Sequence, residues 1–391
     1  MLEPQSTTLF VLLILIFGAL IWRALAARRA AFRVLAACLA FLPAMAFGVL
    51  AVNRYYDYYQ TWGALIADLT NQSVDAASHV PAVTFSSGSQ SAALDGSHGR
   101  LLQAQEQGYL VRLTVTGQRS HLTRVVYVYL PPQYFEPAYR AYRFPVIELI
   151  HGQPGGPQDW ITVIGVTHTL NTLLAHKTAQ PAVLVMPDAN GGRTISLQCL
   201  NQVGGPQDLT YLAVDLPTQI AHILRVQPPG SAWGVAGYSE GGFCAANMAL
   251  RYPDRYGFAG ALSGYFEPSD NQLANPSRLV SPFNGNIRLQ EQNTPLDEIQ
   301  ELSASAVIPQ FWLAAGAADQ QDVADAESFR QELRLRQPDA PLTLTPGAGH
   351  TLAAWRTQVP SMLTWMTTGL ARAAHEKAGT QPGQTAILAA R

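Results

Sequence analysis

A serine stands inside a glycine-rich turn between two segments of different pattern. The turn Gly237-Tyr-Ser-Glu-Gly241 follows a short apolar run and leads at once into an alanine-rich helical pattern. A strand, a Gly-x-Ser-x-Gly turn and a helix together hold a serine hydroxyl clear of the sheet on strained backbone. The N-terminus of the helix offers free N–H groups and a partial positive charge to a developing anion. We therefore predict that Ser239 is a nucleophile and that a side chain at Gly237 or Gly241 would collide with the neighbouring strand or helix. A chance glycine-rich turn is the alternative.

A serine hydroxyl needs an adjacent base, and the base needs a third group to orient it. With this type of turn, the chain order is serine, acid, histidine. After Ser239 the sequence contains His350 and His375. His375 lies in a polar tail, whereas His350 lies in a glycine-rich turn between the last predicted strand and the last predicted helix. We predict that His350 is the base, with a surface histidine as the alternative.

Two aspartates compete for the role of the acid. Asp319 comes directly after the predicted strand 309–315, at the sheet edge where the serine and histidine are expected. Asp322 follows three residues later and could cap the next helix, a common role for aspartate. The spacing favours Asp319 as the acid that orients His350 and Asp322 as the cap.

Stabilising the oxyanion of an acyl-transfer reaction requires two backbone N–H groups aimed at one oxygen. The residue after the nucleophile, Glu240, would supply the first. The second is expected from the loop His151-Gly-Gln-Pro-Gly155, which follows the predicted strand 144–150. Pro154 has no N–H, so Gln153 is the predicted donor. The alternative is that this loop is a plain turn.

The chain has three cysteines, Cys38, Cys199 and Cys244, and no Cys-x-x-Cys pair, so a structural zinc site is not expected. Cys199 lies in a loop and Cys244 in the first turns of the helix after Ser239. Outside the cytoplasm such a pair could be oxidised to a disulfide that ties the loop to the helix. Two buried thiols are the equal alternative. Cys38 lies in an apolar segment and is expected to pack as a small apolar residue.

Two apolar segments near the amino terminus, 6–22 and 34–53, contain no charged residue. Each approaches the roughly 20 apolar residues that a membrane-spanning helix needs. Four basic residues and no acidic one lie between the segments: Arg23, Arg28, Arg29 and Arg33. Basic loops stay in the cytoplasm, so residues 1–54 are predicted to form two spans with both outer ends across the membrane. A cleavable signal peptide is the rival interpretation.

The segments outside the predicted spans and domain have simpler patterns. Tyrosine and tryptophan cluster at 54–62, which is typical of the membrane interface, although an ordinary aromatic loop would look alike. Residues 55–98 are predicted to form a juxtamembrane segment and a linker, because 70–98 are rich in Ser, Ala, Gly and Gln. Residues 374–391 are predicted to be a disordered tail.

Strand and helix patterns alternate between residues 99 and 373, which predicts one α/β catalytic domain. The predicted strands are 109–115, 123–130, 144–150, 182–186, 231–238, 258–263, 309–315 and 342–345, and the predicted helices include 164–176, 210–225, 323–335 and 352–371. This alternation indicates a mainly parallel central sheet with helices on both faces. A loop-rich insertion is expected at 266–305.

Composition limits the classes of partner. The 391 residues carry a formal net charge of −2 with scattered basic residues, so nucleic acid is not an expected partner. Charged residues make up 13% of the chain and hydrophobic residues 48%, an apolar balance that agrees with membrane segments.

From about residue 100 to 371 the chain resembles the α/β-hydrolase superfamily, and within it the putative-esterase group that includes esterase D and the antigen 85 mycolyltransferases. The resemblance is carried by Tyr129-Leu-Pro-Pro132, Leu149-Ile-His-Gly-Gln-Pro-Gly-Gly156, Gly237-Tyr-Ser-Glu-Gly-Gly242, Gly316-Ala-Ala-Asp319, and Gly349-His350 followed by Trp355. It implies serine hydrolysis or acyl transfer without metal or cofactor, with Ser239, Asp319 and His350 as the triad. The chain differs from cytosolic esterase D in its predicted anchor, and no antigen 85 acyl-binding motif is recognisable in 266–305.

These observations together predict a membrane-anchored serine esterase on the extracytoplasmic side. It would cleave carboxylic esters through an acyl-enzyme. The tether favours ester substrates near the bilayer, such as acyl or aminoacyl esters of envelope lipids. The alternatives are an acyltransferase of the mycolyltransferase type and a non-catalytic binding protein that has kept the fold.

Overall fold

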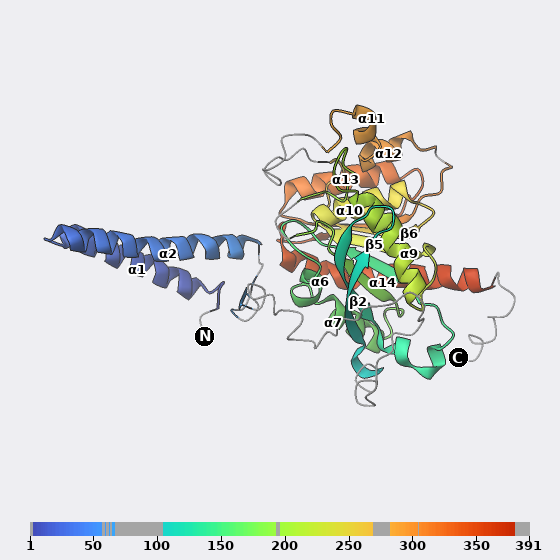
Figure 1. The fold of residues 1–391 in the computed structure, drawn as a ribbon, viewed down its shortest axis with the longest axis horizontal. Helices are drawn as coiled ribbons and strands as arrows, with labels where there is room; N and C mark the ends of the chain where they lie inside the picture. Colours follow the sequence, from blue (N-terminus) through green and yellow to red (C-terminus); the bar gives the residue numbers. More distant parts are fainter. Residues whose placement is uncertain are drawn as a thin grey trace. The chain divides into compact units, whose positions relative to one another are not determined.

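The structure, a computed structural model, describes residues 3–56, 59, 62, 65–66, 105–192, 196–268, 282–303 and 305–379. The chain divides into two compact units: residues 1–77 with 351–353, and residues 78–350 with 354–391. The first unit contains the apolar amino-terminal segments. The second contains the whole sheet (Figure 1).

Two long helices form the described part of the amino-terminal unit: α1 (Thr7–Ala26) and α2 (Ala30–Tyr56). They run antiparallel, because Phe10 packs edge-on against Phe47 at 5.2 Å and the Arg54 guanidinium donates to the Gln5 carbonyl at 2.8 Å. Both helices are longer than the predicted segments 6–22 and 34–53, since the helical backbone continues through Arg23 and Arg33. By length and composition, both could cross a membrane. No residue of α1 is buried within the protein.

Much of the predicted juxtamembrane segment and linker, 55–98, lies outside the described residues. Of the aromatic cluster, Tyr55 and Tyr56 end helix α2, and Tyr59 and Trp62 are described beyond it. The Tyr59 carbonyl accepts a hydrogen bond from the Asn53 amide at 2.9 Å, and the Trp62 backbone N–H donates to the Glu3 carboxylate at 3.2 Å.

The second unit is built on a mixed, mainly parallel sheet of eight strands. The strands are β1 (Tyr109–Thr116), β2 (Thr123–Leu130), β3 (Val146–Ile150), β4 (Val183–Pro187), β5 (Gly230–Tyr238), β6 (Tyr256–Leu262), β7 (Gln310–Gly316) and β8 (Leu342–Thr345). Their order is β1-β2-β4-β3-β5-β6-β7-β8. The strands β3 to β8 are parallel, and the hairpin of β1 and β2 extends the sheet by antiparallel pairing of β2 with β4. The predicted α/β sheet is confirmed.

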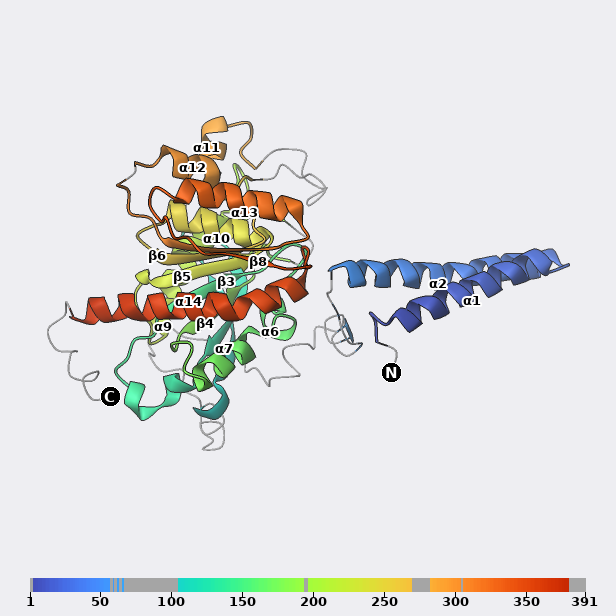
Figure 2. The ribbon, with the colours of Figure 1, turned by 180° about the vertical axis from the view of Figure 1, so that it is seen from behind.

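Helices cover both faces of the sheet. The larger ones are α7 (Val166–Ala175), α9 (Leu216–Ile223), α10 (Glu240–Arg251), α13 (Gln320–Leu333) and α14 (Leu352–Gly379). Shorter segments are η1 (Pro132–Phe135), η2 (Pro137–Tyr139), α6 (Asp159–Thr162), α8 (Asp208–Thr210), the π-helical η3 (Tyr211–Asp215), α11 (Ile287–Glu291) and α12 (Pro295–Glu301). Figures 1 and 2 show α10 and α13 on one side of the sheet and α14 on the other.

Burial explains the strand patterns. Every residue of β3 and β4 is buried, as expected for central strands covered on both faces. In β5 and β6, Gly234 and Gly260 lie against the Met366 and Met362 side chains of α14, where a Cβ atom would stand 2.7 and 3.0 Å from sulfur. By contrast, β8 is an edge strand and is partly exposed.

The structure differs from the sequence prediction at two places in this unit. The predicted tail, 374–391, begins too early, because α14 continues to Gly379; residues 380–391 lie outside the described part. The insertion 266–305 was expected to be loop-rich, yet its described part contains α11 and α12. Helix α11 is capped at its N-terminus, because the Asn286 side chain accepts a hydrogen bond from the Leu289 backbone N–H at 3.1 Å.

Candidate active site

The turn between β5 and α10 holds Ser239 in strained backbone with a φ of 56°. Its glycines are required by close backbone contact: a Cβ at Gly237 would stand 2.1 Å from the Gly241 carbonyl oxygen. A Cβ at Gly241 would stand 2.2 Å from the carbonyl oxygen of Ile150, the last residue of β3. The collisions predicted for both glycines are therefore present. The turn projects Ser239 at the carboxyl edge of the sheet.

His350 reaches Ser239 from the connection between β8 and α14. Its Nε2 lies 2.9 Å from the Ser239 Oγ, across a sequence separation of 111 residues. The imidazole packs edge-on against the Trp355 ring, with centroids 5.0 Å apart. Trp355 is in turn stacked on Tyr238, the residue before the serine, at 4.6 Å. The aromatic contacts thus fix the ring plane of the histidine beside the nucleophile.

The acid that contacts His350 is Asp322, and the prediction of Asp319 is wrong on this point. The Asp322 Oδ2 lies 2.8 Å from the His350 Nδ1. Asp319 is instead the N-cap of α13, and its Oδ1 accepts from the backbone N–H groups of Gln321 and Asp322, each at 3.1 Å. The two aspartates have exchanged their predicted roles. The reason is helical geometry: a side chain in the first turn of α13 projects sideways toward the β8–α14 turn, whereas the cap residue is turned back onto the helix end.

Ser239, His350 and Asp322 form one hydrogen-bonded chain suited to proton transfer. The His350 side chain is 30% exposed and that of Asp322 12%, so a substrate can reach the serine while the acid stays sheltered. Ligand atoms of Asp319, Asp322 and His350 lie within 4.8 Å of one another, a spacing at which a metal could also bind. Because both His350 nitrogens already face hydrogen-bond partners, the geometry favours the proton relay.

The two predicted oxyanion donors lie on loops that touch each other. The loop after β3 contacts the turn through the Ile150 and His151 carbonyl oxygens, which would crowd a Cβ at Gly241. Neither the Gln153 nor the Glu240 backbone N–H has a hydrogen-bond acceptor among the residues that the structure describes. Glu240 is the first residue of α10, so its N–H carries the positive end of the helix dipole. Both groups are available to a substrate oxygen.

One amide connects the side chains of these two residues. The Asn190 Nδ2 donates to the Gln153 Oε1 at 3.2 Å and to the Glu240 Oε1 at 2.9 Å. The Ser196 hydroxyl and the Gln198 backbone N–H also donate to the buried Glu240 carboxyl group. Burial raises the pKa of Glu240, and these hydrogen bonds partly offset that rise. Asn190 thus fixes the spacing between the two loops that carry the free N–H groups.

A disulfide adds a covalent link to the same region. Cys199 is bonded to Cys244 across 45 residues, which joins the loop after β4 to helix α10. Of the two arrangements that the sequence left open, the structure has the disulfide. In the same loop, the Leu197 N–H donates to the Asn190 Oδ1 at 3.1 Å. Cys38, in α2, is free and exposed within this chain.

Three residues of the site were not predicted: Asp322 as the acid, Asn190 as the connecting amide, and Ser196 as a donor to Glu240. The sequence carried a weak signal for the second. Asn190 lies in the loop Pro187-Asp-Ala-Asn-Gly-Gly192, which follows the buried strand β4 at the edge where the serine lies. Polar residues at that edge are candidates for the site.

The sheet, the turn that carries Ser239, the first turn of α13 with Asp322 and the connection with His350 have the arrangement of an α/β-hydrolase. Comparison with known proteins gives the family. The chain belongs to the putative esterase family, whose pattern matches residues 119–376. The matched range contains Ser239, Asp322 and His350.

Two curated relatives match parts of the chain. The chain is 25% identical over 272 residues to an uncharacterized protein of Corynebacterium glutamicum, covering 67% of this chain and 62% of the relative. It is 31% identical over 126 residues to the MPT51/MPB51 antigen of Mycobacterium bovis, covering 32% of this chain and 38% of the antigen. The chain thus spans less than two thirds of either relative.

Two solved structures show the same fold at low identity. A ferulic acid esterase superposes with a TM-score of 0.57 at 19% identity, covering 68% of this chain and 99% of the esterase. An S-formylglutathione hydrolase from Agrobacterium tumefaciens superposes with a TM-score of 0.54 at 18% identity, covering 68% of this chain and 96% of the hydrolase. The predicted α/β-hydrolase fold is confirmed.

Proposed function

We propose that the protein is a serine esterase that is anchored in a membrane by α1 and α2 and works on the extracytoplasmic side. The observation that carries the catalytic part is the hydrogen-bonded chain from the Ser239 Oγ through His350 to Asp322, with distances of 2.9 and 2.8 Å. A fold that had become a non-catalytic binding protein would not need this complete set. The free N–H groups beside Ser239 support the same conclusion.

The reaction begins with a proton transfer from Ser239 to the His350 Nε2. The serine oxygen attacks the ester carbonyl, and the Asp322 carboxylate stabilises the imidazolium that forms. The backbone N–H groups of Gln153 and Glu240 bind the oxyanion, which is where hydrogen-bond donors lower the barrier most. His350 then gives its proton to the departing alkoxide and leaves an acyl group on Ser239. Water, activated by the same histidine, releases the acid.

The amino-terminal unit supports the membrane part of the proposal. Its two helices are apolar, and the rest of the protein leaves most of their side chains uncovered. The segment that joins them contains arginines and no acidic residue. Such a pair fits two spans with a cytoplasmic turn, which leaves the catalytic domain outside. The disulfide agrees with an oxidising compartment. A tethered enzyme meets esters near the bilayer first, so acyl or aminoacyl esters of envelope lipids are the proposed substrates.

Labelling with a fluorophosphonate probe tests the serine mechanism. We expect the wild-type protein to be labelled and the Ser239→Ala variant to lose both labelling and ester cleavage. Ser263→Ala is the matched control, because Ser263 also directly follows a strand of the sheet and also has a positive φ. Cleavage retained in Ser239→Ala would contradict the proposal, and the absence of labelling in the wild type would favour a binding protein.

An ester panel that includes envelope lipid extracts then defines the substrate. Acyl transfer is the alternative outcome of the same chemistry, because an alcohol can resolve the acyl-enzyme in place of water. Adding acceptor alcohols and measuring free acid against new ester separates the two reactions. Predominant formation of new ester would make the protein an acyltransferase of the mycolyltransferase type.

A further inference from the structure

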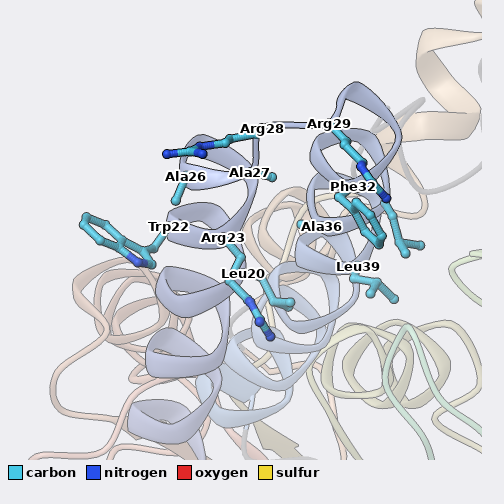
Figure 3. Close-up of a pocket in the computed structure, with 11 residues that line it drawn as sticks. Leu20, Trp22, Arg23, Ala26, Ala27, Arg28, Arg29, Phe32, Ala36 and Leu39 are labelled. Carbon is cyan, nitrogen blue, oxygen red and sulfur yellow. The ribbon is translucent and has the colours of Figure 1, made fainter.

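A cavity lies between α1 and α2 at the end where the two helices are joined. Its volume is about 700 Å³, and Figure 3 shows residues of both helices and of the turn around it. Its walls are part apolar and part basic, and include Trp22, Arg23, Arg28, Arg29, Phe32 and Leu39. The size falls within the range of roughly 300–1,000 Å³ that small-molecule sites occupy.

The basic side chains of this cavity have no counter-charge. Between residues 4 and 56 the sequence contains no aspartate or glutamate. In the described part of the chain, neither Arg23, Arg28 nor Arg29 has an ion pair or a side-chain hydrogen bond. The nearby Arg33 differs, because its Nε donates to the Ala27 carbonyl oxygen at 2.7 Å and caps the end of α1. Three guanidinium groups are thus left for a ligand.

Of these arginines, Arg23 has the position that best fits an anion entering from the helix end. Figure 3 shows the Arg23 side chain directed toward the gap between the helices, and Arg28 and Arg29 on opposite sides of the turn. Guanidinium groups are planar and carry several N–H donors, which match the oxygen atoms of a phosphate. The charge and geometry of this end therefore favour a phosphate-bearing ligand.

The remaining wall indicates that the ligand has an apolar part. Phe32 and Leu39 line the cavity below the arginines, and both side chains are largely exposed within the chain. Trp22 is 73% exposed and stands at the same level as Arg23. Tryptophan at the end of an apolar helix prefers the headgroup layer of a bilayer. A free inorganic anion would make none of these apolar contacts. A phospholipid would contact both the arginines and the apolar side chains.

We propose that this cavity binds the headgroup of an anionic phospholipid from the cytoplasmic leaflet, with its acyl chains along Phe32 and Leu39. The inference rests on the proposed anchoring of α1 and α2 in the membrane. Basic pockets between membrane helices on the cytoplasmic side are suited to anionic headgroups. The bound lipid neutralises the arginines and fixes the helix pair at that face of the bilayer.

Lipid-specific quenching of Trp22 tests the proposal on the full chain. The protein is placed in phosphatidylcholine vesicles containing equal mole fractions of either brominated phosphatidylglycerol or brominated phosphatidylcholine. The Trp22 signal is the difference between wild type and Trp22→Phe. We expect brominated phosphatidylglycerol to quench Trp22 more strongly, and Arg23→Gln to weaken the preference about fivefold. Arg54→Gln is the matched control, because it removes one charge at the other end of the helix pair.

The outcomes separate this proposal from the proposed enzyme activity. Equal quenching by the two lipids in wild type, or an equal effect of Arg23→Gln and Arg54→Gln, would overturn the lipid site. Loss of the preference on adding inorganic phosphate would also overturn it, since a soluble anion would then be the ligand. Cleavage of a soluble ester in the same vesicles reports on Ser239 separately. No quenching by either lipid would contradict the membrane anchor and with it this site.

Discussion

The half of the candidate active site that carries Ser239 is held by backbone contacts that leave no room for a side chain at Gly237 or Gly241. The half that carries Asp322 and His350 is held by two side-chain hydrogen bonds between separate turns. The first half lies in the centre of the sheet, between β3 and β5, and is cross-linked by a disulfide. The second lies after β7 and β8, toward an edge strand that is partly exposed.

This difference separates two tasks of the chemistry. In the proposed reaction, oxyanion stabilisation requires donors that are fixed before the reaction, and the central half contains the two N–H groups proposed for this task. Proton transfer requires a histidine that can approach first the serine and then the leaving group, which a partly exposed turn permits. Each half can therefore be tested by substitutions that should leave the geometry of the other half unchanged.

The largest expected effect concerns the two aspartates of the outer half. Asp322→Asn should lower kcat by about 10⁴-fold, because the amide cannot hold the productive imidazole tautomer or stabilise the imidazolium. Asp319→Asn should change kcat by only a few-fold, since asparagine caps helices as well as aspartate does. Steady-state kinetics on a soluble ester measure both. Equal losses in the two variants would contradict the assignment of Asp322.

The same contrast explains what could be predicted from the sequence. The turn around Ser239 was predictable because its glycines report backbone contacts that tolerate no alternative. The histidine was predictable by elimination within the chain order. The choice between Asp319 and Asp322 was not, since both stand at the same strand end and differ in how the first turn of α13 is oriented. That orientation depends on packing against β7 and β8, which no local pattern records.

Asn190 illustrates a further limit of sequence reasoning. Its partners, Gln153 and Glu240, are 37 and 50 residues away, and their meeting depends on the strand order β4-β3-β5. The alternation of strands and helices predicts the class of sheet but leaves that order open. The ends of the amino-terminal helices were not predictable either. The apolar pattern stops at Arg23 and Arg33, whereas the helical backbone continues through both residues.

The disulfide of the central half should be its largest single source of stability. Closing a loop of 45 residues corresponds to about 4 kcal/mol of unfolding free energy on loop-entropy grounds. We expect the double variant Cys199→Ala, Cys244→Ala to lose about 4 kcal/mol of unfolding free energy. Urea unfolding of the full-length protein measures this loss. Cys38→Ala, at the free cysteine, is the control and should leave the unfolding free energy unchanged. A double variant as stable as wild type would show that the non-covalent contacts alone hold the loop.

The central half also contains a buried carboxyl group, Glu148 in the middle of β3. Burial raises its pKa to about 8, and the Tyr256 hydroxyl donates to its Oε2 at 2.9 Å. The folded chain therefore holds a proton that the unfolded chain releases near pH 4.5. The contribution of this group to the unfolding free energy is fully present below pH 4.5. It is lost as the pH rises toward 8, by up to about 1.4 kcal/mol per pH unit.

Replacing this carboxyl group with an amide should remove that part of the pH dependence. We expect Glu148→Gln to be the more stable protein at pH 8 and to lose its advantage near pH 5. Urea unfolding at several pH values measures the difference between the two proteins. Glu327→Gln, at an exposed glutamate of α13, is the control and should follow wild type throughout. Parallel curves for Glu148→Gln and wild type would show that Glu148 is ionised in the folded protein.

The connecting amide of the central half should affect rate more than binding. Asn190→Ala removes the hydrogen bonds to Gln153 and Glu240, so the two N–H donors lose their fixed spacing. We expect kcat to fall about tenfold with little change in KM, as for an interaction used mainly in the transition state. Asn247→Ala is the control, because Asn247 is also a buried asparagine whose side-chain amide donates a hydrogen bond, here to Asn293 at 3.3 Å. Asn247 lies farther along α10, away from the two N–H donors. A rise in KM at unchanged kcat would instead place Asn190 in substrate binding.

The smallest effect is expected at a glycine of the outer half. Gly347, in the turn before His350, has a φ of +69°, and no atom lies within 4 Å of the position that a Cβ would take. Gly347→Ala should therefore cost only backbone strain, about 1 kcal/mol of unfolding free energy, and should change kcat by less than about threefold. Gly241→Ala meets the Ile150 carbonyl oxygen instead and should prevent correct folding of the turn. Thermal unfolding and fluorophosphonate labelling of the two variants compare the halves directly. If Gly347→Ala abolished labelling while Gly241→Ala retained it, the rigid half of the site would be the one that carries His350.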